Sequence, residues 1–151
     1  MIKVGIINVT GYAGMELARL LKHHTKVELV GVTGRSLVGQ ELNAAFPHLD
    51  EMHLNILEQD RIEGAEMVFS ALPHGASAKA CVRELERGAK VIDLSADFRL
   101  HDFTEYQSWY NIEHPAPEYL KESVYGLTEL HRSEVTAARL VANPGCYPTG
   151  A

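Results

Sequence analysis

The sequence has little cysteine, no long apolar run and no block of basic residues, and each absence argues against a class of protein. With only two cysteines in 151 residues, a disulfide scaffold is not expected. No run approaches the roughly 20 apolar residues of a membrane span, and the first residues show no secretion signal. The 14 basic residues are scattered in a chain of net charge −6, which argues against nucleic acid as the main partner. We therefore expect a cytoplasmic protein that binds neither membrane nor nucleic acid.

Apolar runs typical of buried strands alternate with segments of helical periodicity. The expected strands are Lys3–Val9, Val27–Thr33, Glu66–Leu72, Lys90–Leu94 and Arg139–Ala142, and the expected helices are Met15–Lys22 and Ala76–Arg87. This alternation predicts a Rossmann-like α/β fold, with a mostly parallel sheet wound by helices on both faces. Two segments break the rhythm. Residues 35–60 are expected to form a long loop with one short strand near 53–57, and residues 100–135 an insertion of short helices and loops.

The loop Thr10-Gly11-Tyr12-Ala13-Gly14, between the first expected strand and helix, has features of a dinucleotide site. Glycines let the backbone approach a pyrophosphate, and a helix N-terminus supplies free N–H groups. A longer glycine pattern would have its first glycine at position 8, where this chain has Asn8. Asparagine tolerates left-handed backbone better than most residues. The alternative interpretation of the loop is a plain tight turn.

The end of the second expected strand favours NADP over NAD. An NAD site usually has an Asp or Glu there to hold the ribose hydroxyls. This chain has Thr33-Gly34-Arg35-Ser36 instead, with no acid. Arg35 can pair with a 2′-phosphate and Ser36 can donate a hydrogen bond to it. A solvated surface arginine is the alternative.

Cys146 lies in Asn143-Pro144-Gly145-Cys146-Tyr147-Pro148, where a helix is expected to begin. A helix N-terminus lowers the pKa of a thiol and supplies N–H groups for a developing oxyanion, which Asn143 and Gly145 could help to hold. A small buried cysteine is the alternative, and Cys81, on the apolar face of an expected helix, fits that alternative better.

Polar groups that follow the third and fourth expected strands belong to the edge of a parallel sheet where ligands bind. After the fourth strand, Ser95 and Arg99 are candidate substrate contacts, with Arg99 suited to a carboxylate or phosphate. The alternative is a surface loop with a local Asp97–Arg99 contact. After the third strand, His74 could line a cofactor site or belong to a helix-capping loop. None of the eight histidines has convincing metal spacing, so we assign no metal.

Several segments occur together in the order typical of one enzyme family. They are Thr10-Gly11-Tyr12-Ala13-Gly14-Met15-Glu16-Leu17, Ala71-Leu72-Pro73-His74-Gly75, Asp93-Leu94-Ser95-Ala96-Asp97-Phe98-Arg99, Tyr125-Gly126-Leu127 and Asn143-Pro144-Gly145-Cys146-Tyr147-Pro148-Thr149. Over nearly its whole length the chain resembles the N-acetyl-γ-glutamyl-phosphate reductase family of arginine biosynthesis, in the aspartate-semialdehyde dehydrogenase-like superfamily. The segments at 94–99 and 143–149 are specific to that family, and the glycine loop is not.

The resemblance implies an oxidoreductase that reduces N-acetyl-γ-glutamyl phosphate to N-acetylglutamate semialdehyde with NADPH and releases phosphate. By position, Cys146 matches the family's nucleophile. The implied cofactor residues are Thr10, Gly11, Tyr12, Ala13 and Gly14 for the pyrophosphate, Arg35 and Ser36 for the adenosine phosphate, and Pro73 and His74 near the nicotinamide. The expected substrate-binding residues are Ser95, Arg99, Asn143 and Gly145.

The chain departs from the family's pattern in two places. Asn8 stands where the family's loop usually has a glycine. Family members also continue beyond the nucleophile into a second α/β domain, which carries an acid/base histidine and the oligomer interface. We therefore expect residues 1–151 to be the NADP-binding domain of a homo-oligomeric enzyme, ending just after the cysteine loop and inactive alone. The alternatives are a related reductase of aminoadipyl or aspartyl phosphate, and a non-catalytic dinucleotide-binding module with a structural Cys146.

Overall fold

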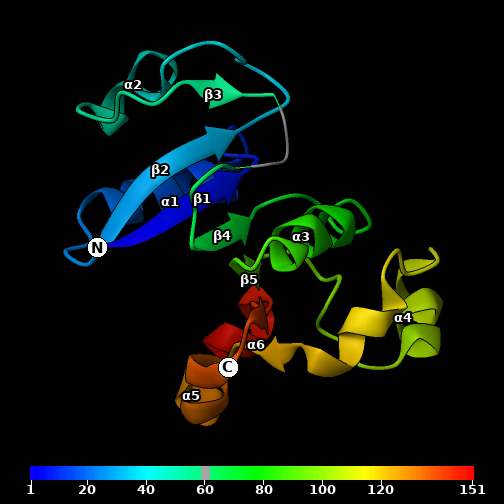
Figure 1. Cartoon of the computed structure of the whole chain (residues 1–151). Coiled ribbons are helices and arrows are strands. Elements are labelled where there is room, and N and C mark those ends of the chain that lie inside the picture. The colour runs from blue at the N-terminus through cyan, green and yellow to red at the C-terminus, as the bar shows by residue number, and fades with distance from the viewer. Residues whose placement is uncertain (59–61) are drawn as a thin grey trace. The chain divides into compact units, whose positions relative to one another are not determined.

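The computed structural model describes residues 1–58 and 62–151 of the chain (Figure 1). The chain forms two compact units, Met1–Ala71 (unit 1) and Leu72–Ala151 (unit 2), and each is described by itself. The last two residues of the loop expected over 35–60 lie outside the described residues. Among the described residues, no helix has both the length and the apolar character needed to cross a membrane.

Unit 1 is a parallel sheet with helices. Its described strands are β1 (Ile2–Ile7), β2 (Val27–Thr33), β3 (Ile56–Leu57) and β4 (Met67–Ser70). They pair in the order β3-β2-β1-β4, and every pair is parallel. Its helices are α1 (Tyr12–Lys22), α2 (Leu42–Ala45) and a 3-10 helix, η1 (Pro47–Leu49). The expected parallel arrangement of the first three long strands is confirmed, and the short strand expected near 53–57 is β3.

Both faces of the unit 1 sheet are covered, which explains why its strands are apolar throughout. On one face, Ile6 and Val32 pack with Ala18 of α1 and with Leu42 and Leu49. On the other face, Ile62 lies against two glycines that are paired across β1 and β2. A Cβ atom on Gly5 or on Gly31 would stand 2.5 Å from the Ile62 side chain. The glycines in these strands are therefore required by close packing.

Unit 2 holds a shorter parallel sheet surrounded by helices. Its described strands are β5 (Lys90–Asp93), β6 (Val124–Tyr125) and β7 (Leu140–Ala142), in the order β5-β7-β6. Its helices are α3 (Ser77–Glu86), α4 (Phe103–Tyr110), the 3-10 helix η2 (Pro117–Glu122), α5 (Thr128–Ala137) and α6 (Cys146–Gly150). The core residues come from α3, β5, β7 and the segment between β5 and β6, and they include Cys81, Leu85, Val91, Phe98, Leu120 and Leu140.

Strand β6 lies within the segment that we expected to contain only short helices and loops, so that prediction was incomplete. β6 has two residues, which is too short to show the alternation or the apolar run that marks a strand. It forms because Val124 and Tyr125 pair in parallel with Val141 and Ala142 of β7. A tertiary contact, not local sequence, creates this strand.

The buried carboxylate of Asp97 connects three segments of unit 2. Its Oδ1 atom accepts hydrogen bonds from the Gly75 N–H at 2.7 Å and from the Tyr106 hydroxyl at 2.8 Å, while Oδ2 accepts from the Ala78 N–H at 2.9 Å. Burial, together with the Asp97 carboxylate, raises the pKa of Tyr106, so its hydroxyl stays protonated and donates. Asp97 thus satisfies N–H groups at the start of α3 and attaches α4 to it.

We predict that Asp97→Asn lowers the free energy of unfolding by about 2 kcal/mol. One carboxylate oxygen would become an NH₂ group, so a buried group that now donates to Asp97 would lose its acceptor. The measurement is urea unfolding followed by circular dichroism. The matched control is Asp102→Asn, since Asp102 is the exposed N-cap of α4 and accepts from the Thr104 and Glu105 N–H groups. Asparagine caps helices as well as aspartate does, so this variant should stay within about 0.5 kcal/mol of the parent. Equal losses in the two variants would contradict the role given to Asp97.

Candidate functional site

The loop after β1 presents an uncapped helix N-terminus. Asn8 has a left-handed backbone (φ 64°), and α1 begins at Tyr12 with Gly11 as its N-cap residue. No side chain caps this end, and no acidic residue lies in the first turn. Gly14 belongs to that turn, where a Cβ atom would stand 2.3 Å from the Asn8 carbonyl oxygen. The helix therefore lies close against β1, with its positively polarised end open to an anion.

The end of β2 lies beside this loop. The Val9 N–H donates to the Thr33 carbonyl at 2.8 Å, and a Cβ atom on Gly34 would stand 2.8 Å from Cγ2 of Thr10. The next two residues, Arg35 and Ser36, are both exposed. Unit 1 thus brings together the residues predicted to hold the pyrophosphate and those predicted to hold the adenosine phosphate.

The other predicted cofactor residues, Pro73 and His74, belong to unit 2 and are exposed. The Ala76 N–H donates to the Pro73 carbonyl at 3.2 Å, which closes a turn, and Gly75 has φ +78°. The His74 ring lies 5.4 Å from the ring of Tyr110. His74 also lines a cavity of about 620 Å³ together with Gly75, Lys79, Ile112, Glu113, His114 and Pro115. The turn that carries His74 is held at Gly75 by Asp97.

The two cysteines have opposite environments. Cys146 is exposed and is the first residue of α6, directly after the turn that follows β7. Cys81 is fully buried in the core of unit 2. The interpretation of Cys146 as a small buried hydrophobe is therefore contradicted, and for Cys81 it is confirmed. Cys146 lies in a cavity of about 650 Å³, whose other lining residues are Arg99, Leu100, Tyr110, Tyr125, Gly145, Tyr147 and Pro148.

Arg99 supports the loop that carries Cys146. Its Nε donates to the Asn143 carbonyl at 2.8 Å, and its Nη2 donates to the Leu94 carbonyl at 3.0 Å. A Cβ atom on Gly145 would stand 3.2 Å from Nη1, so glycine lets the guanidinium lie against the loop. The Asp97–Arg99 contact of a plain surface loop is absent among the described residues, because Asp97 is occupied by donors from α3 and α4. Arg99 is instead among the residues that line the cavity.

Ser95 and Asn143 form part of the supporting structure. The Ser95 hydroxyl donates to Asp93 at 2.6 Å and accepts from the Asp97 N–H at 3.0 Å, and Ser95 is 7% exposed. The Asn143 N–H donates to the Asp93 carbonyl at 2.8 Å. Burial raises the pKa of Asp93, and hydrogen bonds from Ser77 and Ser95 oppose that shift. A direct substrate contact for Ser95 stays a prediction.

Tyr110 and Tyr125 were missed among the site residues. They come from α4 and β6, which belong to the segment of short helices where most of the aromatic residues of the chain occur. That concentration of aromatic residues was one available signal, and for Tyr125 the family-typical segment Tyr125-Gly126-Leu127 was a second. Neither signal indicated which aromatic residues line the same cavity as Cys146.

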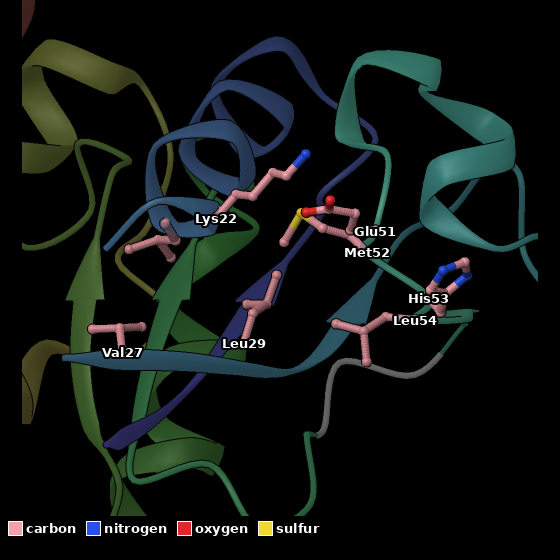
Figure 2. A pocket seen from close by; sticks show the side chains of 8 residues that line it. Lys22, Val27, Leu29, Glu51, Met52, His53 and Leu54 are labelled. Carbon is pink, nitrogen blue, oxygen red and sulfur yellow. The ribbon is translucent and has the colours of Figure 1, made fainter. Parts of the chain in front are cut away.

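A further cavity, of about 340 Å³, lies in unit 1 away from every predicted site residue. It is bounded by the end of α1, by β2 and by residues 51–54, and Figure 2 shows the side chains of Leu29 and Met52 directed toward one another across it. Lys22, on its rim, is paired with Asp50. Leu21, Val27, Leu29, Met52 and Leu54 supply its apolar lining, and Lys22, Glu51 and His53 supply its polar groups.

The parallel strands, the crossover helices and the glycine loop together define a Rossmann-like nucleotide-binding domain. A family model described as semialdehyde dehydrogenase, NAD binding domain, matches residues 3–138. The chain belongs to this family.

Named relatives are consistent with this assignment. The chain is 57% identical over 150 residues to an N-acetyl-gamma-glutamyl-phosphate reductase of Dehalococcoides mccartyi, and 49% identical over 148 residues to one of Thermus thermophilus. These alignments cover 99% and 98% of this chain but 43% of each relative. The chain thus spans less than half the length of the curated relatives that it matches.

Solved structures confirm the fold. Aspartate semialdehyde dehydrogenase II of Vibrio cholerae, complexed with ASA, aligns with a TM-score of 0.71 at 16% identity, over 97% of this chain and 42% of that one. Aspartate semialdehyde dehydrogenase of Candida albicans with NADP aligns with a TM-score of 0.65, also at 16% identity, over 99% of this chain and 44% of that one. At this level of identity the comparison concerns the fold alone.

We predict that iodoacetamide at neutral pH alkylates Cys146 at least about ten-fold faster than Cys81, because burial must be relieved by local unfolding before Cys81 can react. Intact-mass spectrometry followed by peptide mapping measures the two rates. Cys146→Ser should abolish the fast modification, and Cys81→Ala should leave it unchanged. Comparable rates at the two thiols in the folded chain would refute the environments described here.

Proposed function

We propose that this chain is the NADP-binding domain of an acyl-phosphate reductase that converts N-acetyl-γ-glutamyl phosphate to N-acetylglutamate semialdehyde, with Cys146 as the nucleophile. One observation carries the proposal: an exposed thiol at the start of α6 shares a cavity with the guanidinium of Arg99. The names of relatives at 45–57% identity supply the substrate.

The residues of unit 1 fit a dinucleotide. The uncapped end of α1 supplies N–H groups to a pyrophosphate, and the glycines at 11 and 14 keep side chains away from it. Beside it, the exposed Arg35 can form a bidentate contact with a 2′-phosphate, with Ser36 as a further donor. No acid follows β2 before Glu41, so a ligand for the ribose diol of NAD is lacking at this position.

The chemistry that this chain's residues perform begins at Cys146. The thiolate sulfur forms a bond to the acyl carbon, the bond from that carbon to the phosphate oxygen breaks, and phosphate leaves with the electron pair, which gives a thioester. A bound NADPH would supply the hydride that reduces this thioester. In the resulting tetrahedral adduct on Cys146, an oxygen electron pair re-forms the carbonyl, the carbon–sulfur bond breaks, and its electron pair returns to sulfur, which releases the aldehyde and regenerates the thiolate.

Arg99 and the turn at 143–145 serve the same step. An acyl phosphate carries negative charge, and negative charge also develops on the carbonyl oxygen as sulfur attacks. The guanidinium of Arg99 offers Nη1 to an anion while its Nε and Nη2 atoms stay bound to backbone carbonyls. The N–H groups at the start of α6, shaped by Asn143 and Gly145, are donors for the developing oxyanion.

A non-catalytic nucleotide-binding module is the alternative from a different class. In such a module Cys146 would be structural and buried, whereas it is exposed and lines a cavity together with Arg99, so its environment favours the reductase.

The homo-oligomeric assembly and the choice between N-acetylglutamyl and related acyl phosphates are further parts of the proposal, and they derive from the resemblance to the relatives.

For the cofactor, we predict that the chain binds NADP more tightly than NAD, and that Arg35→Ala weakens NADP binding by about ten- to a hundred-fold with little effect on NAD. Isothermal titration calorimetry measures both constants at one salt concentration. Arg132→Ala, at an exposed arginine of α5, is the control and should change neither. A response to NAD equal to or stronger than that to NADP would overturn the assignment of Arg35 and Ser36.

For the nucleophile, we predict that N-acetyl-γ-glutamyl phosphate transfers its acyl group to the chain and that the adduct maps to Cys146. Because thioester formation precedes hydride transfer, this half-reaction needs no NADPH, and intact-mass spectrometry under mildly acidic quench detects the added mass. Cys146→Ser should lose the adduct, and Cys81→Ala should retain it. An adduct that persists in Cys146→Ser, or one that maps to another residue of the parent chain, would refute the proposed role.

A further inference from the structure

Asn8 is the residue that closes β1 and opens the glycine loop, and it adopts a conformation that most side chains avoid. Its φ is 64°, one of four positive values at non-glycine positions among the described residues. A glycine would adopt this backbone without strain. Asparagine tolerates it better than most residues, and at this position its side chain also makes a hydrogen bond that a glycine would lack.

The side chain of Asn8 binds the end of β4. Its Nδ2 donates to the carbonyl of Ala71 at 2.8 Å, one residue beyond the end of that strand. Its backbone N–H also reaches the Thr33 hydroxyl of β2 at 3.4 Å, and its carbonyl accepts from the Gly11 N–H at 3.3 Å. A single residue thus connects the loop to the carboxyl ends of both neighbours of β1.

Asn8 also determines where Gly11 and α1 lie. A Cβ atom on Gly11 would stand 3.1 Å from the Asn8 Nδ2, so the amide fills the space directly beside the N-cap residue of α1. In the first turn of α1, a Cβ atom on Gly14 would stand 2.3 Å from the Asn8 carbonyl oxygen. The loop is therefore packed on both the amide and the carbonyl of Asn8.

We propose that Asn8 is a positioning residue that pre-organises the pyrophosphate-binding loop by tying it to β4 through its side-chain amide. This inference rests on the proposed dinucleotide site. When a loop is already ordered, ligand binding does not have to offset the entropy lost in ordering it. The hydrogen bond from the Asn8 amide therefore raises the affinity for the ligand without contacting the ligand. A glycine at this position would supply the backbone angle and lose the anchor.

The test compares ligands that do and do not use the loop. Asn8→Gly keeps the left-handed angle accessible, removes the bond to Ala71 and should weaken NADP binding about ten-fold. Binding of 2′-AMP, which has the phosphate for Arg35 and no pyrophosphate, should be unchanged. Asn8→Asp has the same size and tolerates the same backbone, but its carboxylate cannot donate to the Ala71 carbonyl. It should weaken NADP binding at least as much as Asn8→Gly.

The matched control is Asn111→Gly. Asn111, at the end of α4, also has a left-handed backbone conformation (φ 54°), and its backbone N–H donates a hydrogen bond to the Gln107 carbonyl. This variant should bind NADP with the same affinity as the parent chain. Melting temperatures confirm that each variant is folded under the titration conditions. Unchanged NADP affinity in either Asn8 variant, or an equal loss for NADP and 2′-AMP in Asn8→Gly, would overturn the positioning role. If the parent itself bound no NADP, the cofactor proposal would fall first, and this inference with it.

Discussion

The buried carboxylate of Asp97 is the interaction on which the candidate site of unit 2 depends. A carboxylate removed from water is unfavourable unless donors surround it, and three donors from different segments meet this one. Each donor belongs to a part that the site needs: the turn that carries His74, the first turn of α3, and α4, which brings Tyr110 to the cavity. Moving any of these segments away while Asp97 stays buried would remove one donor from the carboxylate. The carboxylate therefore couples their positions to one another.

The segment that follows β5 divides its polar residues between inside and outside. Asp93, Ser95 and Asp97 are buried and bind one another and the start of α3, whereas Arg99 is directed toward the cysteine loop. This division shows that the residues of a short polar motif can have separate structural tasks. Most of its members are constrained by hydrogen-bond geometry in the interior, and only the last one reaches the cavity.

Local patterns in the sequence predicted the elements whose cause is local. The run Val27–Thr33 is β2 to the residue, and the strands at 67–70, 90–93 and 140–142 lie inside their expected ranges. The helix α1 begins at Tyr12, three residues before the expected start at Met15. The prediction placed the start too late because the apolar periodicity that marks the helix is not visible in Tyr12-Ala13-Gly14. What could not be predicted depends on tertiary contacts. Such features are the pairing of β6, the capture of Asp97 by α3 and α4, and the bond from Asn8 to Ala71.

The structure also changes which group is the better candidate for the positive charge expected near Cys146. The sequence pattern attributed it to a helix N-terminus, whose dipole is equivalent to roughly half an elementary charge in a helix of ordinary length. Here α6 has five residues, so few peptide dipoles add up. Arg99, by contrast, contributes a full charge among the residues that line the cavity, and none of those lining residues is a carboxylate that would cancel it. Two of its nitrogen atoms are fixed on backbone carbonyls, so the charge is held in place instead of moving with solvent. A full charge exceeds the partial charge at the end of a short helix, so the proposed stabilisation of negative charge at this site is assigned first to Arg99 and only second to α6.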